Sequence, residues 1–380
     1  MQVDVSAKID RWLAAFEPPT PCVVIDLDQV RRQHELLAAA FSFAEIFYAV
    51  KANPAPEVIR VLAGLGVGFD LASDGEIERC RAQGVAAARL SFGNTIKRVP
   101  DIQRAHAHGL RLYAFDSGEE LEKLAVHAPG AQVFCRLHVP ANGAEWPLTR
   151  KFGCPADTAV HLLVEAKRLG LRPAGVSFHV GSQQKDPHAW DQPIAAAARI
   201  FHVCAARGID LQLLNLGGGL PSHYRHPIAT IAQYGDILET ALRAAFGGSL
   251  PRTIIEPGRY MVGDAGLLRA QVLLVTQRSR QAKHRWVYLD AGRYNGLTET
   301  LGERIQYRLR PSRDGGPIGP VSLAGPTCDS TDILYERAGY ELPLALQTGD
   351  WVDFLSAGAY TASYASVEFN GFAPIRTYCI

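Results

Sequence analysis

The sequence predicts an α/β protein with an N-terminal (β/α)₈ barrel and a C-terminal, mostly antiparallel β domain. Apolar segments of strand length alternate with helical patterns from residue 45 to residue 256, as is typical of βαβ units. A barrel of this kind takes about 250 residues. Polar residues follow the apolar segments, at the strand ends where barrel enzymes hold their functional groups. The predicted barrel strands are 45–50, 67–72, 89–94, 112–117, 132–139, 173–180, 211–217 and 252–256.

The segments around these strands complete the predicted barrel domain, 22–262. An apolar run at 22–27 predicts a further strand, and an amphipathic pattern around Trp12 is ended by the prolines that follow it. Ser73 and Glu76 form a capping-box pattern at the start of a helix. Helical patterns lie, for example, at 54–63, 74–83, 156–169 and 187–207.

The pattern changes after Asp264, where strand-like segments are separated by Pro- and Gly-rich turns rather than long helices. We therefore expect a β domain over 263–380 that also takes in the N-terminal segment 1–21. Its predicted strands are 267–276, 284–290, 318–324 and 350–356.

Composition excludes several classes of protein. Hydrophobic residues make up 47% and charged residues 20%, and the net charge is +1, which is ordinary for a globular enzyme. We expect no nucleic-acid partner, because there is no dense basic run with interleaved aromatics. We expect no membrane association, because no apolar run is long enough to span a bilayer. The seven cysteines contain no Cys-x-x-Cys pair, which favours reduced thiols in the cytoplasm and no metal site.

Lys51 stands at the end of the first buried barrel strand. A lysine there can extend its amine to solvent, pair with a carboxylate, or form a Schiff base with a carbonyl after desolvation. The other strand ends carry further polar groups and glycines. They are Asp70 and Ser73, Asn94, Asp116, Arg136, His179 and Ser182, Gly217, Gly218 and Gly219, and Glu256 and Arg259.

Each of these motifs has a structural and a functional interpretation. Three glycines after strand seven can make a tight turn or can present backbone N–H groups to a phosphate. Glu256 and Arg259 can pair with each other, or can hold a protonated ring nitrogen and a phosphate. His179 can be a core histidine or can stack on a flat cofactor. Together with the Lys51 amine, these groups describe a pyridoxal phosphate site.

Two motifs in the predicted β domain are also open to two interpretations. Cys328 is followed by Asp329 in a turn, where the carboxylate can cap the turn or bind a distal ammonium group. Tyr360 can pack with its hydroxyl at the surface or can reach a phosphate.

In their order along the chain, these motifs resemble the barrel-type (fold type III) pyridoxal phosphate decarboxylases, with their alanine racemase-like barrel. The similarity runs from about residue 20 to the C-terminus and is closest to bacterial ornithine or lysine/ornithine decarboxylases, through 289–292, 296–297 and 369–372. The motifs are Tyr-Ala-Val-Lys-Ala-Asn (48–53), Gly-Phe-Asp-Leu-Ala-Ser (68–73), His-Val-Gly-Ser (179–182), Leu-Gly-Gly-Gly (216–219), Glu-Pro-Gly-Arg (256–259) and Gly-Pro-Thr-Cys-Asp (325–329).

The resemblance implies a role for each matching residue. Lys51 would carry pyridoxal 5′-phosphate with Asp70 nearby, and Arg136 would approach the ring hydroxyl. His179 would stack on the ring, and Glu256 would pair with its nitrogen. The phosphate would be held by Ser182, Gly219, Arg259 and Tyr360. Gly217, Gly218 and Gly258 would also belong to the cofactor-binding residues. Lys51, His179, Glu256 and Cys328 form the implied catalytic set.

The family resemblance also implies a homodimer whose active sites are shared across the interface. Cys328 would enter the partner's site to return a proton to the decarboxylated carbon, and Asp329 would bind the substrate's terminal ammonium. Asp290 would lie on the segment that sets substrate length, and Lys151 and Asp332 would pair across the interface.

The implied reaction is decarboxylation of L-ornithine to putrescine, a step of polyamine biosynthesis, with L-lysine to cadaverine as a possible second reaction. Asp329 argues against diaminopimelate, because enzymes for that substrate usually carry Glu there. The segment 288–300 differs from that of the eukaryotic ornithine enzymes, so the sequence leaves ornithine and lysine open. Arginine decarboxylation, racemisation and a non-catalytic, partner-binding homologue are the alternatives. The last is disfavoured because Lys51, Cys328 and Asp329 are all present.

Overall fold

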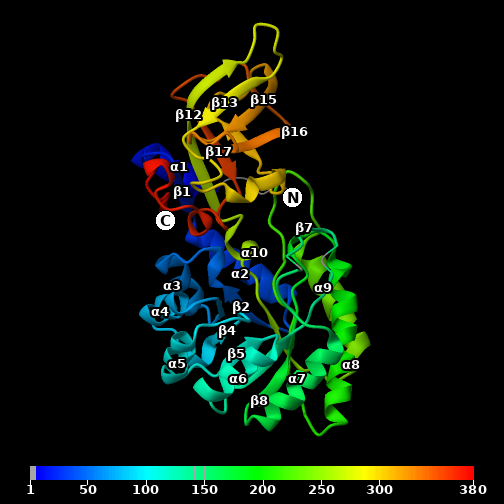
Figure 1. Ribbon diagram of the computed structural model, residues 1–380. Helices are drawn as coiled ribbons and strands as arrows, with labels where there is room; N and C mark the ends of the chain where they lie inside the picture. Colours follow the sequence, from blue (N-terminus) through cyan, green and yellow to red (C-terminus); the bar gives the residue numbers. More distant parts are fainter. Residues whose placement is uncertain (1–5, 141, 149) are drawn as a thin grey trace. The chain divides into compact units, whose positions relative to one another are not determined.

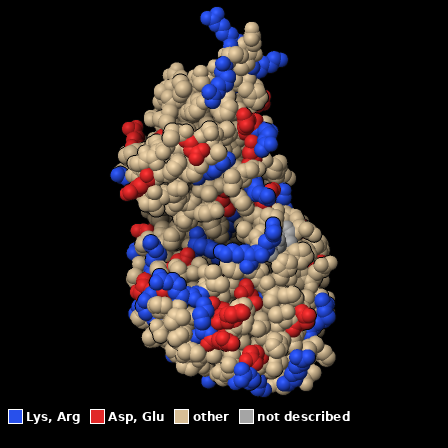
Figure 2. All heavy atoms as spheres, viewed as in Figure 1, with Lys and Arg blue, Asp and Glu red and all other residues tan. Residues whose placement is uncertain are grey.

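A computed structural model describes residues 6–140, 142–148 and 150–380 (Figure 1). The chain divides into two compact units. The barrel unit comprises Arg31–Pro221 and Ile228–Gly258. The β unit comprises the described residues up to Val30, together with Ser222–Pro227 and Arg259–Ile380. Among the described residues, no helix combines the length and the apolar character needed to cross a bilayer. On the face shown in Figure 2, basic and acidic side chains are interspersed.

The barrel unit contains a closed barrel of parallel strands, as the sequence predicts. Neighbouring strands follow the order β10-β11-β2-β3-β4-β5-β6-β8 around the barrel. Each strand lies inside its predicted segment or within one residue of it. The strands are β2 (Glu45–Ala49), β3 (Gly68–Leu71), β4 (Leu90–Phe92), β5 (Leu112–Phe115), β6 (Gln132–Arg136), β8 (Arg172–Ser177), β10 (Leu213–Asn215) and β11 (Arg252–Ile255).

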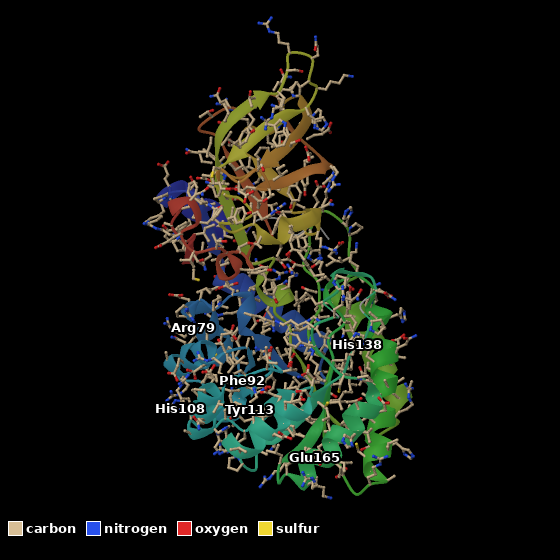
Figure 3. All side chains as sticks on the ribbon, in the orientation of Figure 1. Arg79, Phe92, His108, Tyr113, His138 and Glu165 are labelled. Atoms are coloured by element: carbon tan, nitrogen blue, oxygen red, sulfur yellow. The ribbon has the colours of Figure 1, made fainter. Side chains whose placement is uncertain are left out.

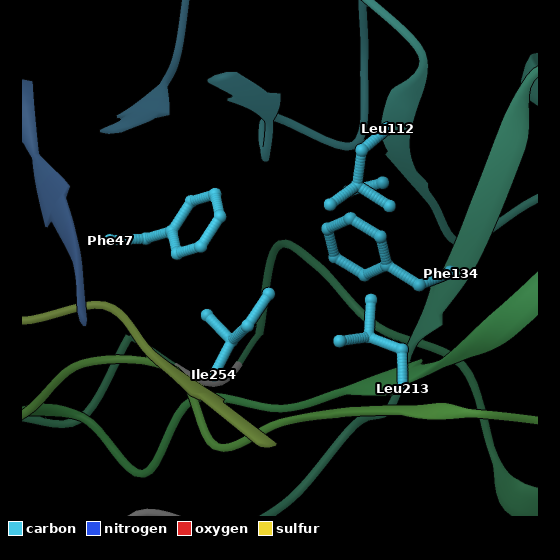
Figure 4. Close-up of a cluster of buried hydrophobic side chains, with 6 residues drawn as sticks. Phe47, Leu112, Phe134, Leu213 and Ile254 are labelled. Carbon is cyan, nitrogen blue, oxygen red and sulfur yellow. The ribbon is translucent and has the colours of Figure 1, made fainter. Parts of the chain in front are cut away.

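Side chains fill the interior of the barrel (Figure 4). Phe47, Phe134 and Ile254 are each no more than 4% exposed and belong to one cluster with Leu112 and Leu213. These residues come from five different strands, so burying them ties the barrel together. Burial of such a side chain contributes about 1.5–3 kcal/mol. Tyr113 on β5 alternates with Leu112 and Ala114 of this cluster, so its ring lies on the opposite face of the strand, 6.2 Å from the ring centroid of Phe92 on β4 (Figure 3).

Some helices of the barrel unit begin at a residue whose side chain caps the first turn. Ser73 Oγ accepts a hydrogen bond from Glu76 N at 3.4 Å, as the predicted capping box requires. The Glu76 carboxylate, however, accepts from Ala72 N rather than from the cap residue, so only half of the box forms. The helices are α2 (Leu27–Ala40), which begins in the β unit, α3 (Pro56–Gly64), α4 (Asp74–Ala82), α5 (Val99–Ala107), α6 (Gly118–His127), α7 (Ala156–Arg168), α8 (Asp191–Ala205) and α9 (Ile231–Phe246).

Shorter elements complete the barrel unit. A two-stranded antiparallel sheet joins β7 (Ala144–Trp146) to β9 (Ser182–Gln184). The helix expected at 187–207 is divided into a 3₁₀ turn and α8. The 3₁₀ turns are η1 (Val50–Ala52), η2 (Ala87–Arg89) and η3 (Pro187–Trp190).

The β unit is a mostly antiparallel sheet, as predicted, in the order β14-β17-β12-β13-β15-β16. Two pairs are parallel, β13 with β15 and β1 with β18. The strands are β1 (Cys22–Ile25), β12 (Gly266–Gln277), β13 (Arg285–Leu289), β14 (Leu309–Pro311), β15 (Ile318–Ala324), β16 (Ile333–Pro343), β17 (Trp351–Leu355) and β18 (Arg376–Cys379). The helices and 3₁₀ turns are α1 (Ala7–Phe16), α10 (Arg259–Val262), η4 (Thr298–Glu303), η5 (Ala362–Tyr364) and η6 (Phe369–Gly371).

The predicted barrel range of 22–262 needs correction at both ends. Strand β1 pairs with β12 and β18, so it belongs to the β sheet rather than to the barrel. All four of its residues are buried, and a continuous apolar run does not reveal which sheet covers it. Residues 222–227 and 259–262 likewise belong to the β unit.

Candidate active site

The carboxyl ends of the barrel strands surround a pocket of about 610 Å³ within the barrel unit. Because the strands are parallel, their carboxyl ends meet at one mouth of the barrel. Asp116 is not part of the lining, because its carboxylate accepts a hydrogen bond from Gly153 N at 2.7 Å. Six of the predicted polar residues line the pocket, namely Lys51, Asp70, Asn94, Arg136, His179 and Glu256.

Lys51 is held at this pocket by a carboxylate. Its Nζ lies 3.1 Å from Asp70 Oδ2. The Lys51 side chain is 46% exposed, so the amine is not desolvated as the Schiff-base interpretation assumed. Asp70 Oδ1 is buried and has no hydrogen-bond partner among the described residues. Gly93 makes room for it, since a Cβ there would lie 1.9 Å from Oδ1. The Lys51–Asp70 pair thus leaves a buried acceptor oxygen, Asp70 Oδ1, beside the solvent-accessible amine of Lys51.

Glu256 is half-buried and directly follows β11. Asn215 Nδ2 donates to Glu256 Oε1, and Asn215 Oδ1 accepts from Gly217 N at 2.9 Å. Burial, followed by the negative charge of Asp70, raises the pKa of Glu256 to about 7. Asn215 therefore couples the glycine turn to this carboxylate, a role that the sequence did not reveal.

Replacing Glu256 with Gln is expected to remove one source of pH-dependent stability from the cofactor-free protein. The folded pKa lies near 7 and the ordinary value near 4.5, so the folded state holds a proton that the unfolded state releases. The stabilisation from this group is therefore complete below pH 4.5 and is lost as the pH rises through 7, a change of up to about 3 kcal/mol.

The measurement is urea unfolding of parent and variant at pH 5 and at pH 8. His179 contributes with the opposite sign, because burial lowers its pKa to about 3. It is present in both proteins, so the difference between them isolates Glu256. Equal slopes of stability against pH in parent and variant would contradict the assignment.

His179 is a neutral imidazole at the pocket wall. Burial, then the charges of Arg136 and Lys51, lower the pKa of His179 to about 3. Gly181 N donates to its Nδ1 at 3.0 Å, which places the ring proton on Nε2. A neutral, fixed imidazole is suited to packing against a flat ring.

Arg136 lies beside Phe152, a residue that the sequence did not single out. Its guanidinium carbon is 5.2 Å from the ring centroid of Phe152, and Lys151 Nζ is 4.7 Å from the same centroid. Burial lowers the pKa of Arg136, although the carboxylate of Glu256 opposes this. Phe152 therefore holds two cations at the pocket.

The glycine turn after β10 requires glycine at each position. A Cβ at Gly217 would lie 2.1 Å from Phe178 O, and one at Gly218 would lie 2.6 Å from Glu256 O. Gly219 has φ +114°, and a Cβ there would lie 2.6 Å from Gly181 O. Ser182 begins β9 immediately after Gly181, and Gly258 is buried beyond β11. Such a turn lets backbone N–H groups approach an anion closely.

Arg259 and Tyr360 come together within the β unit. The Arg259 guanidinium carbon lies 4.9 Å from the ring centroid of Tyr360. The Arg259 guanidinium forms a bidentate ion pair with Glu299 of the same unit, at 2.6 and 2.7 Å.

Cys328 and Asp329 lie in an exposed turn of the β unit. Cys328 N donates to Asn370 Oδ1 at 2.9 Å. Asp329 accepts from Thr331 N and Oγ1 through Oδ1, and from Tyr294 Oη through Oδ2 at 2.9 Å. Hydrogen bonds from the Thr331 backbone, then from the Thr331 and Tyr294 side chains, lower the pKa of Asp329. This carboxylate is therefore ionised at neutral pH.

Asp290 and Asp332 are engaged with their own unit. Asp290 Oδ1 accepts from Gln271 N at 2.7 Å, and burial raises the pKa of Asp290. The carboxylate predicted to face substrate is thus used to join β12 to the chain after β13. Asp332 is 3% exposed and accepts from Arg293 N and from Thr327.

These residues fit pyridoxal 5′-phosphate. An amine, a carboxyl group that can retain a proton near neutral pH, a neutral imidazole and a glycine cradle are the groups that such a cofactor needs. The barrel unit carries Lys51, Asp70, Arg136, His179, Ser182, the glycines and Glu256, whereas the β unit carries Asp290, Arg259, Cys328, Asp329 and Tyr360.

Comparison with known proteins agrees with this chemistry. A family model described as pyridoxal-dependent decarboxylase, pyridoxal binding domain, matches residues 27–263. The lysine/ornithine decarboxylase of Selenomonas ruminantium is 34% identical over 93% of this chain and 88% of its own length. Antizyme inhibitor 2 of Xenopus laevis is also 34% identical, over 97% of this chain and 83% of its own.

Solved structures show the same similarity. Lysine decarboxylase from Selenomonas ruminantium matches with a TM-score of 0.89 and 33% identity, covering 99% of this chain and 96% of that one. The arginine decarboxylase of Paramecium bursaria Chlorella virus matches with a TM-score of 0.89 and 28% identity, covering 98% of this chain and 100% of that one.

Proposed function

The chain belongs to the pyridoxal-dependent decarboxylases, and from that membership we propose that it converts L-ornithine to putrescine, with L-lysine to cadaverine as a second reaction. The observation that carries this proposal is the ionised, half-buried carboxylate of Asp329 beside the exposed Cys328. A carboxylate held by three hydrogen bonds is a fixed partner for the distal ammonium group of a diamino acid.

Each residue of the proposed site would have its own role in the reaction. The cofactor supplies an electron sink for the pair left at the α-carbon when carbon dioxide departs. Lys51 would hold the cofactor covalently, with Asp70 orienting the amine. Glu256 would hold a proton at the pyridine nitrogen, because its raised pKa keeps a proton available near neutral pH. His179 would pack on the ring, and Cys328 would return a proton to the former α-carbon.

The phosphate would bind to backbone N–H groups of the glycine turn, to Ser182, and to Arg259 and Tyr360. The glycine turn supports this assignment because a side chain at any of its three positions would strike backbone atoms. Arg136 would approach the ring hydroxyl, which its position among the pocket-lining residues supports.

We further propose a homodimer in which Cys328 and Asp329 complete the partner's site. The exposure of Cys328 supports this, as do exposed apolar residues in the segment whose Asn370 accepts from Cys328 N, with Val367 76% and Phe369 37% exposed. The expected pairing of Lys151 with Asp332 of the second copy would add an ion pair to a carboxylate that already has partners in its own chain. Seven free cysteines support a cytoplasmic location.

Side-by-side measurement of kcat/KM for ornithine, lysine, arginine and diaminopimelate tests the substrate. We expect ornithine to be the best and lysine to lie within about 10- to 200-fold of it, because one methylene contributes about 1–3 kcal/mol. Arginine and diaminopimelate should be poorer, since each presents a different distal group to Asp329. A higher kcat/KM for arginine would overturn the assignment. Loss of the substrate's chirality without carbon dioxide release would indicate a racemase instead.

A partner-binding role without catalysis is the second candidate, because antizyme inhibitor 2 is among the relatives. The presence of Lys51, Cys328 and Asp329 favours catalysis. The two candidate functions are separated by adding pyridoxal 5′-phosphate and then ornithine to the purified protein. An absorbance band in the visible range together with carbon dioxide release supports the enzyme, and the absence of both supports the partner-binding role.

A further inference from the structure

A buried ion pair lies beneath Tyr360 in the β unit. Arg259 Nη1 donates to Glu299 Oε2 at 2.7 Å and Nη2 donates to Oε1 at 2.6 Å. Nη1 also donates to Tyr224 Oη at 2.8 Å. The side chains of Arg259 and Glu299 are only 2% and 7% exposed. The two parallel hydrogen bonds fix both the plane and the rotation of the guanidinium.

The local backbone makes Glu299 a rigid support. Glu299 lies in η4, where Thr300 Oγ1 donates to Leu297 O at 2.7 Å and Ile305 N donates to Glu299 O at 3.2 Å. Leu297 N in turn donates to Gly292 O at 3.0 Å. The carboxylate thus projects from a turn that is itself anchored, so it can hold a fixed direction.

Stability alone is a poor reason for such a pair. Removing two charges from water has a large desolvation cost, and well-packed apolar residues of similar volume often give the folded protein equal or greater stability. Burial alone would lower the pKa of Arg259, but the charge of Glu299 raises it well above its usual value. The pair therefore keeps a charged guanidinium in a buried place, in contact with Tyr360, the other phosphate residue expected in this unit.

We propose that Glu299 is a positioning residue for the cofactor phosphate, because it sets the orientation in which Arg259 meets that group. The inference rests on the proposed phosphate role of Arg259. A preset guanidinium loses little side-chain freedom when the anion arrives, so more of the interaction appears as affinity.

Two other roles for Glu299 make different predictions. If Glu299 only stabilised the fold, its loss would weaken all ligands equally. If it only offset the arginine charge, its loss would strengthen phosphate binding. The discriminating quantity is the phosphate increment, which we define as the dissociation constant of pyridoxal divided by that of pyridoxal 5′-phosphate. Both ligands carry the aldehyde that reacts with Lys51, and only one carries the phosphate.

The experiment measures this increment on cofactor-free protein by visible absorbance. We expect Glu299→Ala to lower the increment at least about tenfold, which corresponds to about 1.4 kcal/mol. Glu299→Gln, of the same shape, should lower it less, because its carbonyl oxygen keeps one of the two hydrogen bonds. Glu299→Gln also provides the test if the Glu299→Ala variant fails to fold. Arg259→Ala should lower the increment at least as much as either.

The matched control is Asp353→Ala, which breaks another bidentate pair of the β unit. Arg269 contacts Asp353 at 2.7 and 2.9 Å, and the Asp353 side chain is 1% exposed. This variant should lose thermal stability and keep the parental increment. An unchanged or higher increment in both Glu299 variants, with a lower one in Arg259→Ala, would overturn the positioning role. An unchanged increment in Arg259→Ala would instead overturn the proposed role of Arg259.

Discussion

Replacing Lys51 with alanine should abolish both decarboxylation and the visible absorbance band of the bound cofactor. Lys51 is the amine that Asp70 holds at the pocket, with Nζ 3.1 Å from Oδ2. Lys151, the other pocket-lining lysine, is placed over the Phe152 ring instead. Without Lys51, the described residues that line the pocket have no amine held beside Asp70 to bind the cofactor covalently, so we expect kcat/KM to fall by roughly a thousandfold or more.

Lys167→Ala provides the control for this experiment. Lys167 donates to Gly208 O at 2.8 Å on the exposed side of the barrel unit, and it is not part of the pocket. This variant should keep the absorbance band and the parental kcat/KM. Full turnover by Lys51→Ala would contradict the proposed mechanism, whatever the behaviour of the control.

Mixing Lys51→Ala with Cys328→Ala should restore activity that neither variant has alone. In the proposed homodimer each site takes Lys51 from one chain and Cys328 from the other. A heterodimer of the two variants then has one site with both defects and one intact site. With equal amounts and complete subunit exchange, half of the dimers are mixed, so we expect about a quarter of the parental activity.

The control for the mixing experiment combines Lys51→Ala with Glu256→Ala. Both residues lie in the barrel unit, so every site of that heterodimer would carry one defect and no activity should return. Mass spectrometry of differently tagged chains verifies the exchange. If exchange is complete and the first mixture stays inactive, each site is built from one chain and the shared-site proposal is wrong.

The barrel could be predicted from sequence because its signal is local. Each strand is a short apolar run closed by polar or glycine residues, and eight such runs alternating with helices have few other arrangements. Strand β16 was missed for the same reason. Within Ile333–Pro343 lie Glu336, Arg337 and Gly339, which break the apolar pattern that marks a strand. Strand β16 is recognised only by its antiparallel pairing with β15.

The candidate site was predictable to the extent that barrel topology brings strand ends together. Lys51, Asp70, Arg136, His179 and Glu256 could be grouped in advance because parallel strands in a closed barrel have a common mouth. The hydrogen-bond partners of these side chains could not be found in this way. Asn215 directly precedes the Leu-Gly-Gly-Gly motif (216–219) and carried no signal of its own, and Phe152 had no signal beyond its basic neighbours.

The sequence by itself determined which residues stand at the strand ends, and hence the fold class and the chemistry that the barrel can hold. Only the tertiary structure decided how buried charges are paired. Arg259 lies 40 residues from Glu299, and Asp290 accepts from a backbone amide 19 residues away. Such pairs depend on sheet register and on turns between distant segments. An alternation of apolar and polar residues specifies which face is buried, but not which residue lies opposite.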